Sequence, residues 1–213
     1  MASRIPPGRE LLLHDCRLGA RFVVGADEAG RGALAGPLVA AAVVLEPGAL
    51  SAEQVAGLER LNDSKKLTPA RRDELAGLIG AAALAIAVVA ISSAEIDEIG
   101  IQAANLGGLS RALDLVAVPE GAELLVDGFA LPMQARPHRA LVKGDATSAA
   151  IAAASIIAKT TRDRVMEQLD AVSPGYGFGA HAGYGTAVHR EAITRLGPCR
   201  AHRHSFAPIA LAA

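Results

Sequence analysis

The sequence contains few aromatic residues: they make up only 3% of the 213 residues, and tryptophan is absent. Hydrophobic residues still make up 51% of the chain and charged residues 20%, a balance that excludes a disordered protein. The core must therefore be built from Ala, Val, Leu and Ile. Side chains of this size favour helices that pack closely against a sheet.

Cysteine is also scarce, and long apolar runs are missing. Cys16 and Cys199 are the two cysteines and have no metal-ligand spacing, so we expect free thiols in a reducing compartment. Residues 1–9 lack the apolar core of a signal peptide, and the apolar run at 81–91 is too short to span a bilayer. We therefore expect a cytoplasmic protein that makes no membrane contact.

Neither sign of charge is in excess. The chain has 21 Lys and Arg against 22 Asp and Glu, which gives a formal net charge of −1. Proteins that hold a phosphate backbone usually present a basic surface, so the overall charge gives no support for nucleic-acid binding. Any basic patch must be local, and motifs have to identify it.

Apolar runs alternate with helix signals along the chain and predict a mixed α/β domain. We expect strands at 22–26, 38–45, 81–91, 124–126 and 140–143. We expect helices at 68–79, from 93 onward with Ser93 as N-cap, and at 101–116, 148–169 and 191–196. Because this length suits one core, we assign 20–213 to a single domain and 1–19 to an N-terminal extension.

Acidic residues follow three of the predicted strands, as Asp27-Glu28, Asp127 and Asp145. An acid directly after a buried strand lies at a sheet rim or in a cleft. Four carboxylates brought together repel one another unless cations neutralise them, and oxygen ligands select Mg²⁺ or Mn²⁺. Two such ions can hold the attacking and leaving oxygens of a phosphoryl displacement. The alternative is that these acids only form turns, since spacing alone does not bring them together.

A glycine-rich segment, Gly30-Arg31-Gly32, comes soon after the first acids. Glycines let a backbone approach a ligand closely, and Arg31 can pair with a phosphate. The alternative is a flexible connection between two strands. The segment lacks the Gly-Lys-Ser/Thr ending of a Walker loop and the spacing of a dinucleotide fingerprint, so ATP and NAD binding are excluded.

Two other segments are candidates for contact with nucleic acid. Ser64, Lys65 and Lys66 precede a predicted helix and can grip a phosphate, or can form a solvated surface loop. Tyr184 lies in a Gly-rich loop and can stack on a base or sugar, or can anchor the loop. The six histidines show no zinc spacing with the cysteines, so we expect structural or surface roles for them.

Taken together, these segments resemble the motifs of the ribonuclease HII family, and they occur in the family's order across residues 20–208. The matching segments are 27–32 with 35–41, 63–67 with Arg72, 126–128, 143–145 with 151–159 and 162–163, 183–186 with His189, and 203–208. One departure is Ala182, which stands where the family often has Lys. This change weakens one phosphate contact that the resemblance implies and leaves Tyr184 in place.

The resemblance implies a fold and an activity. The fold is a ribonuclease H-like mixed β-sheet flanked by helices, with a C-terminal helical segment. The activity is endonucleolytic: hydrolysis of RNA in RNA/DNA hybrids, and nicking on the 5′ side of single ribonucleotides embedded in duplex DNA. The products carry 3′-hydroxyl and 5′-phosphate ends. The implied role is the removal of ribonucleotides from DNA, and we expect the enzyme to act as a monomer.

The resemblance also implies a role for each candidate residue. The catalytic carboxylates, which would hold two Mg²⁺ or Mn²⁺ ions, are Asp27, Glu28, Asp127 and Asp145. The residues that would contact the ribose 2′-hydroxyl are Gly30, Arg31 and Gly32. Tyr184 would stack on the sugar of the next nucleotide and sense the RNA–DNA junction. The residues that would hold backbone phosphates are Ser64, Lys65 and Lys66.

Two other functions fit parts of the pattern. One is a ribonuclease HIII-like or another two-metal nuclease. Type HIII has Ser and Lys where this sequence has Ala29 and Arg31, and it carries a large N-terminal domain for which we expect no room here. The other is a catalytically silent nucleic-acid-binding module, against which the presence of all four carboxylates argues. The choice between Mg²⁺ and Mn²⁺ stays open.

Overall fold

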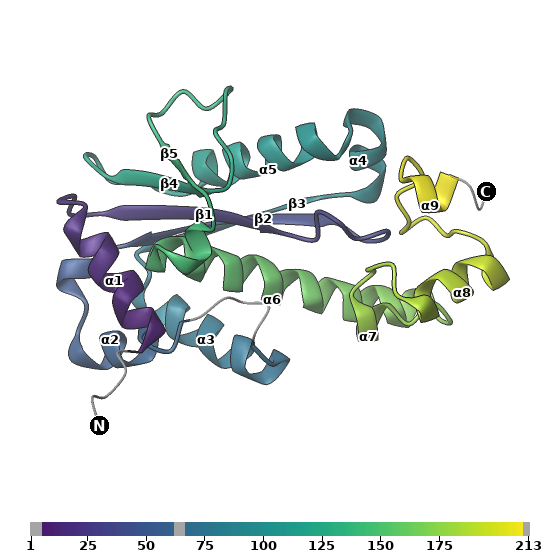
Figure 1. The fold of residues 1–213 in the computed structure, drawn as a ribbon, viewed down its shortest axis with the longest axis horizontal. Helices are drawn as coiled ribbons and strands as arrows, with labels where there is room; N and C mark the ends of the chain where they lie inside the picture. The colour runs from purple at the N-terminus through teal and green to yellow at the C-terminus, as the bar shows by residue number, and fades with distance from the viewer. Residues whose placement is uncertain (1–5, 62–66, 211–213) are drawn as a thin grey trace.

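A mixed β-sheet forms the centre of the molecule (Figure 1). The computed structural model describes residues 6–61 and 67–210. The strands in this part of the chain are β1 (Val23–Ala29), β2 (Leu38–Leu45), β3 (Ala85–Ile91), β4 (Glu123–Asp127) and β5 (Arg139–Leu141). They stand in the order β3-β2-β1-β4-β5; β2 is antiparallel to β1 and β3, whereas β4 is parallel to β1 and β5. The predicted mixed sheet is confirmed.

Helices cover both faces of the sheet (Figure 1). One face carries α1 (Pro7–Arg17), α2 (Ala52–Leu58), α3 (Pro69–Ala82) and α6 (Ala149–Val172). The other carries α4 (Ser93–Ile99) and α5 (Ile101–Leu115). The C-terminal helical segment lies at one end and consists of α7 (Phe178–His181), α8 (Ala187–Leu196) and α9 (Ala207–Ala210). None of the helices at 6–61 and 67–210 has both the length and the apolar character needed to cross a membrane.

The small residues of β1 and α6 let this helix lie very close to the sheet. α6 begins with a run of buried alanines, from Ala149 to Ala154, broken only by Ile151. A Cβ at Gly25 of β1 would lie 2.1 Å from the carbonyl carbon of Ala150, so only glycine fits there. Small side chains, and not aromatic ones, thus fill the space between α6 and the sheet. The close approach brings the first half of α6 against the end of β1, where the first acids stand.

The N-terminal helix α1 fixes the start of α6. Leu11 and Leu12 of α1 are buried in the core that lies between the sheet and α6. The buried carboxylate of Asp15 accepts a hydrogen bond from the backbone N–H of Ala150 at 2.9 Å, and Ser148 caps the same helix end. Burial raises the pKa of Asp15 above its ordinary value. The boundary at residue 20 stays a prediction, because this packing does not decide whether 20–213 folds alone.

The largest differences from the predicted elements lie at their ends. The predicted strand at 81–91 begins only at Ala85, because α3 continues to Ala82 before the chain turns. The N-cap of α4 is Ser92 and not Ser93, since the Ser92 side chain accepts the hydrogen bond of the Glu95 N–H. Helices α1 and α2 have no counterpart among the predicted elements.

Two further differences bear on the candidate site. β1 extends to Ala29, which pairs with Val39 of β2, so Asp27 and Glu28 lie inside the strand and not after it. The antiparallel pairing of β1 with β2 continues beyond the apolar run at 22–26, so the strand includes Asp27 and Glu28. In the C-terminal segment, α8 begins at Ala187, one turn earlier than predicted, because Thr186 caps it.

Candidate active site

The parallel pairing of β1 and β4 brings two of the candidate acids side by side. Ala26 pairs with Val126, and Asp27 and Asp127 are the next residues of the two strands. Side chains alternate along a strand, and the odd-numbered residues of β1 and β4 pack toward α6. Both carboxylates therefore stand on the α6 side of the sheet, at the edge where the parallel strands end.

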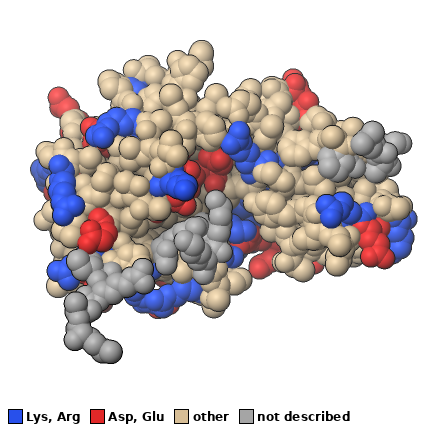
Figure 2. Space-filling view, in the orientation of Figure 1, with Lys and Arg blue, Asp and Glu red and all other residues tan. Residues whose placement is uncertain are grey.

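A cavity of about 310 Å³ opens at this edge of the sheet. Its lining includes all four predicted carboxylates and the predicted Gly-Arg-Gly segment. The lining residues are Asp27, Glu28, Ala29, Gly30, Arg31, Gly32, Asp127, Asp145, Ser155, Lys159 and Tyr184. Acidic side chains gather near the middle of the face drawn in Figure 2, with Lys and Arg side chains beside them. The structure thus brings together acids that lie up to 118 positions apart in the sequence, from Asp27 to Asp145.

Asp27 is the most deeply buried of the four acids, with 5% of its surface exposed. One of its oxygens accepts a hydrogen bond from the Glu28 N–H at 2.7 Å, and the Ser155 hydroxyl also hydrogen-bonds to it. Burial raises the pKa of Asp27 well above its ordinary value, and the negative charges of Glu28 and Asp127 raise it further. A positive charge in the cavity would therefore stabilise its ionised form.

Asp127 organises the turn that carries the fourth acid. Its Oδ1 accepts a hydrogen bond from the Gly144 N–H at 2.6 Å. A Cβ at Gly144 would lie 2.5 Å from Cδ1 of Ile151, so the end of the Ile151 side chain would have to move. Lys143, just before it, has a left-handed backbone with φ of 56°. This turn leads into the short 3₁₀ helix from Gly144 to Ala146 and places Asp145 on the cavity wall.

The donor chemistry of the cavity fits a divalent metal ion. The acidic side chains on its wall offer only oxygen atoms, which Mg²⁺ and Mn²⁺ prefer. Burial, and to a lesser extent the neighbouring carboxylates, raises the pKa of Asp27, and a divalent ion would favour its ionised form. Within residues 6–61 and 67–210, no three His, Cys, Asp or Glu side chains already form a compact metal-binding group. The carboxylates line the cavity without such a preformed group.

The Gly-Arg-Gly segment joins β1 to β2 at the mouth of the cavity. Gly30 has a φ of 91°, and a Cβ there would lie 1.9 Å from Nε of Arg162, so the fold itself requires this glycine. Gly32 is different, because a Cβ there would meet no protein atom within 4 Å. Arg31 donates a hydrogen bond to Oε1 of Gln102 at 2.9 Å and lies 4.7 Å from the ring centre of Phe129.

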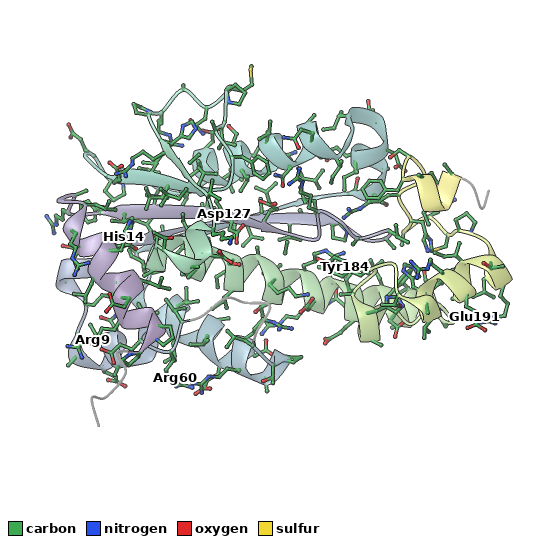
Figure 3. The ribbon with its side chains drawn as sticks, in the orientation of Figure 1. Arg9, His14, Arg60, Asp127, Tyr184 and Glu191 are labelled. Atoms are coloured by element: carbon green, nitrogen blue, oxygen red, sulfur yellow. The ribbon has the colours of Figure 1, made fainter. Side chains whose placement is uncertain are left out.

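Tyr184 lies on the cavity wall away from the acids. Figure 3 shows it displaced from Asp127 toward the α7 end of α6. The side chain is 39% exposed, and its ring centre lies 5.5 Å from the guanidinium carbon of Arg162 and 5.9 Å from Nζ of Lys159. The ring thus lies near two cations, and part of its surface stays open to solvent.

The predicted phosphate contacts Ser64, Lys65 and Lys66 lie outside the described residues. Next to them in the sequence, Arg72 donates to Asp163 at 2.8 Å, and Lys159 donates to the other oxygen of this carboxylate at 2.6 Å. The Arg72 pair links α3 to α6, and the Lys159 pair lies within α6 beside the cavity.

Two cavity residues, Ser155 and Lys159, and the buried Arg162 beside Tyr184 were not among the site residues predicted from the sequence. Ser155, Lys159 and Arg162 lie on one face of α6, at positions i, i+4 and i+7. They are the polar exceptions on a helix face that is otherwise buried, and this spacing was the available signal. Ser155 hydrogen-bonds to Asp27, whereas Lys159 and Arg162 stand beside Tyr184.

A mixed sheet with helices on both faces and carboxylates gathered where its parallel strands end defines a protein of the ribonuclease H-like class. The model of the family described as ribonuclease HII matches residues 24–209. Ribonuclease HII of Rhodococcus erythropolis is 49% identical over 196 residues, which cover 92% of this chain and 84% of the relative. The chain therefore belongs to the ribonuclease HII family and is an endoribonuclease that acts on RNA/DNA hybrids.

Solved structures agree with the fold. Ribonuclease H2 from Pyrococcus horikoshii is similar with a TM-score of 0.73 and 26% identity, covering 90% of this chain and 96% of that one. A ribonuclease HIII in complex with Mn²⁺ also reaches a TM-score of 0.73, at 24% identity, covering 94% of this chain and 71% of that one. The ribonuclease H family depends on divalent metal ions.

Proposed function

We propose that this enzyme nicks duplex DNA on the 5′ side of a single embedded ribonucleotide, in addition to hydrolysing the RNA of longer hybrids. The observation that carries this proposal is the meeting of Asp27, Glu28, Asp127 and Asp145 on one cavity wall that also contains the Gly-Arg-Gly segment and Tyr184. Acids for metal-assisted hydrolysis and candidate sensors of a ribose thus share a single cavity. The biological role that follows is the removal of ribonucleotides from DNA in the cytoplasm.

The four carboxylates are the proposed ligands of two Mg²⁺ or Mn²⁺ ions. When bound, such ions would activate a water for attack on the phosphorus and stabilise the departing 3′-oxygen. The products would carry 3′-hydroxyl and 5′-phosphate ends. The chain's own contribution is to hold the ligands in place. Ser155 orients Asp27, and the Gly144 N–H orients Asp127.

The Gly-Arg-Gly segment is the proposed reader of the ribose 2′-hydroxyl, the group that distinguishes RNA from DNA. The open space at Gly32 supports this role, because a sugar can approach the backbone there without meeting a side chain. Arg31 is exposed at the same mouth and can approach a phosphate. Two different groups of the nucleotide could then be held by one short segment.

Tyr184 is the proposed stacking partner for the sugar of the nucleotide that follows the ribonucleotide. Its position on the cavity wall, away from the acids, suits a contact one nucleotide beyond the cleaved bond. Ser64, Lys65 and Lys66 remain proposed phosphate contacts. We propose that the enzyme acts as a monomer, since one chain supplies all the candidate groups of the cavity.

A cleavage assay with mapped ends tests this function. The substrate is a DNA duplex with one ribonucleotide, incubated with Mg²⁺, with Mn²⁺ or with EDTA, beside an all-DNA duplex of the same sequence. The expected result is one metal-dependent nick on the 5′ side of the ribonucleotide, with a 3′-hydroxyl end. A nick at another position, or none while a long RNA/DNA hybrid is cut, would overturn the proposed specificity.

A further inference from the structure

Arg162 joins the two parts of the cavity to which we assign ribose recognition. The side chain is fully buried in α6. Its guanidinium donates to three backbone carbonyls, those of Pro37 at 2.8 Å, Ala35 at 3.1 Å and Ala182 at 2.9 Å. Two of these carbonyls belong to the connection between β1 and β2, and the third lies two residues before Tyr184. One side chain thus holds both segments.

The surroundings of Arg162 are shaped to accept it. Gly30 leaves space that any Cβ would take from the guanidinium, and the ring centre of Tyr184 lies 5.5 Å from the guanidinium carbon. Ala182 has a left-handed backbone with φ of 49°, which directs the chain back toward the cavity after α7. Within the described part of the chain, no carboxylate lies within ion-pair distance of Arg162. The hydrogen bonds of the buried Arg162 guanidinium therefore go to backbone carbonyls.

Arg203 provides a comparison within the same loop. It is also fully buried, and it donates to the carbonyls of Arg31 at 2.9 Å and of Gly36 at 3.0 and 3.1 Å. No hydrogen bond between Arg203 and residues 182–186 is present in the described part of the chain. Arg203 holds the β1–β2 connection alone, whereas Arg162 holds this connection and the Tyr184 segment together.

We infer that Arg162 is a positioning residue that sets the place of Tyr184 relative to the Gly-Arg-Gly segment, and thereby makes cleavage depend on the RNA–DNA junction. The inference rests on the proposed function. A junction is recognised only if the 2′-hydroxyl of one nucleotide and the sugar of the next are contacted at the same time. The planar guanidinium fixes that spacing because its donors have fixed directions, which the single ammonium of a lysine cannot reproduce.

The test compares R162K with R203K on two substrates, a duplex with one embedded ribonucleotide and a continuous RNA/DNA hybrid. The measured quantity is the ratio of kcat/KM on the first substrate to kcat/KM on the second. We expect R162K to lower this ratio about tenfold, since a small misplacement weakens only the junction contact. R203K is expected to lower both rates and leave the ratio unchanged. An equal loss on both substrates in R162K would overturn the inference.

A double variant shows whether Arg162 acts through Tyr184. Y184A should lower the ratio by itself, because it removes the ring. Adding R162K to Y184A should then change the ratio no further, since coupled residues are not additive. If the two effects on the ratio multiply instead, Arg162 does not act through Tyr184.

Fluorine NMR gives a readout that does not depend on activity. The chain contains two tyrosines, Tyr176 and Tyr184, so 3-fluorotyrosine labelling gives one signal for each. R162K should shift or broaden the Tyr184 signal and leave that of Tyr176 unchanged, whereas R203K should leave both in place. A shift of both signals in R162K, or of neither, would contradict a local positioning role.

A second experiment covers the case in which R162K does not fold. Tyr184 is partly exposed, so Y184A should fold, and coupling between two residues is reciprocal. The Nε–H of Arg162 donates to the carbonyl oxygen of Pro37, and its hydrogen exchange, followed by NMR, should be faster in Y184A than in the wild type. The exchange of the Arg203 Nε–H should change less. Unchanged exchange at Arg162 would overturn the inference. If the wild type cuts neither substrate, the proposed function fails, and the two NMR experiments still decide the coupling.

Discussion

Gly30 and Gly32 stand two positions apart at the cavity mouth, and they are glycines for different reasons. Gly30 has a positive φ and packs on the side chain of Arg162, whereas a Cβ at Gly32 would meet only open space. The two glycines cannot be told apart in the sequence. The structure shows that packing requires glycine at position 30 and that position 32 has room for a side chain. A substitution at Gly32 therefore probes substrate access without disturbing the fold.

The first prediction concerns G32A. The added methyl group should occupy space that the ribose needs, so cutting at a single ribonucleotide should fall by about tenfold or more. The midpoint of thermal unfolding should stay within about 2 °C of the wild type, since surface changes of this kind are nearly neutral. The matched control is G48A, because Gly48 also has no neighbour within 4 Å and lies outside the cavity. Equal activity in G32A and G48A would remove Gly32 from the site.

Three histidines, of which His189 and His202 are buried, form a network beside the Tyr184 loop. His189 Nδ1 lies 3.0 Å from the carbonyl of Tyr184, its Nε2 lies 3.1 Å from Nε2 of His202, and its ring stacks on that of His181. Nδ1 of His202 accepts the Cys199 N–H at 2.9 Å. Burial, and to a lesser extent the neighbouring His189, lowers the pKa of His202 to about 4, and burial lowers that of His189. Burial thus favours the neutral form of the His189 and His202 rings.

The second prediction is a loss of stability on acidification that depends on His202. The unfolded chain takes up this proton near pH 6.5, whereas the folded chain takes it up only near pH 4. The free energy of unfolding should therefore fall as the pH drops through this window, at up to about 1.4 kcal/mol per pH unit. H202N should show a shallower fall, and H204N, at an exposed position, should follow the wild type. Parallel curves for H202N and wild type would contradict this account.

At the scale of elements, the packing of α6 on β1 positions the site. The helix brings Ser155 to Asp27, and it can do so because Gly25 and a run of alanines remove the side chains between the two backbones. The steric conflict at Gly25 involves backbone atoms of α6, which cannot rotate away.

The third prediction compares two glycine substitutions by urea unfolding. G25A should destabilise the protein by about 3 kcal/mol, because the methyl group overlaps the backbone of α6. G80A should stabilise it by about 0.5–1 kcal/mol, since Gly80 lies in α3 with no neighbour within 4 Å and alanine favours a helix. A neutral effect of G25A would show that α6 can move away from the sheet without cost.

Much of the element order and the acid cluster could be predicted from the sequence. Apolar runs locate strands, and the residues around Asp27, Asp127 and Asp145 carry the family's motifs. The extension of β1 through Asp27 could not be predicted, because it comes from pairing with β2 and not from apolar character. The roles of Arg162 and Arg203 were equally hidden, because their partners are backbone carbonyls, which leave no trace in a sequence.

At the scale of the whole molecule, segments near both ends of the described chain contact the elements that carry the cavity. Leu11 and Leu12 of α1 pack with residues of α3, α6 and the sheet. At the other end, Arg203 reaches the β1–β2 connection and Asp97 of α4 accepts hydrogen bonds from His204 and Ser205. Both ends of the described chain therefore support the frame of the cavity.

The fourth prediction concerns the removal of residues 1–19. The shortened chain should fold but lose about 3–5 kcal/mol of unfolding free energy, because two buried leucines and the contact of Asp15 with α6 are lost. Chemical denaturation measures this loss. Stability equal to that of the full chain would show that 1–19 is an independent extension.

The central claim is that the four carboxylates of the cavity form the metal site that cuts at a ribonucleotide, and D127N tests it most directly. Asparagine keeps the oxygen that accepts the Gly144 N–H, so the fold should persist, while a charged ligand is lost. We predict a fall of about a hundredfold or more in Mg²⁺- or Mn²⁺-dependent nicking of a duplex with one ribonucleotide. D114N, an exposed acid of α5 outside the cavity, should cut like the wild type. Wild-type nicking by folded D127N would contradict the account.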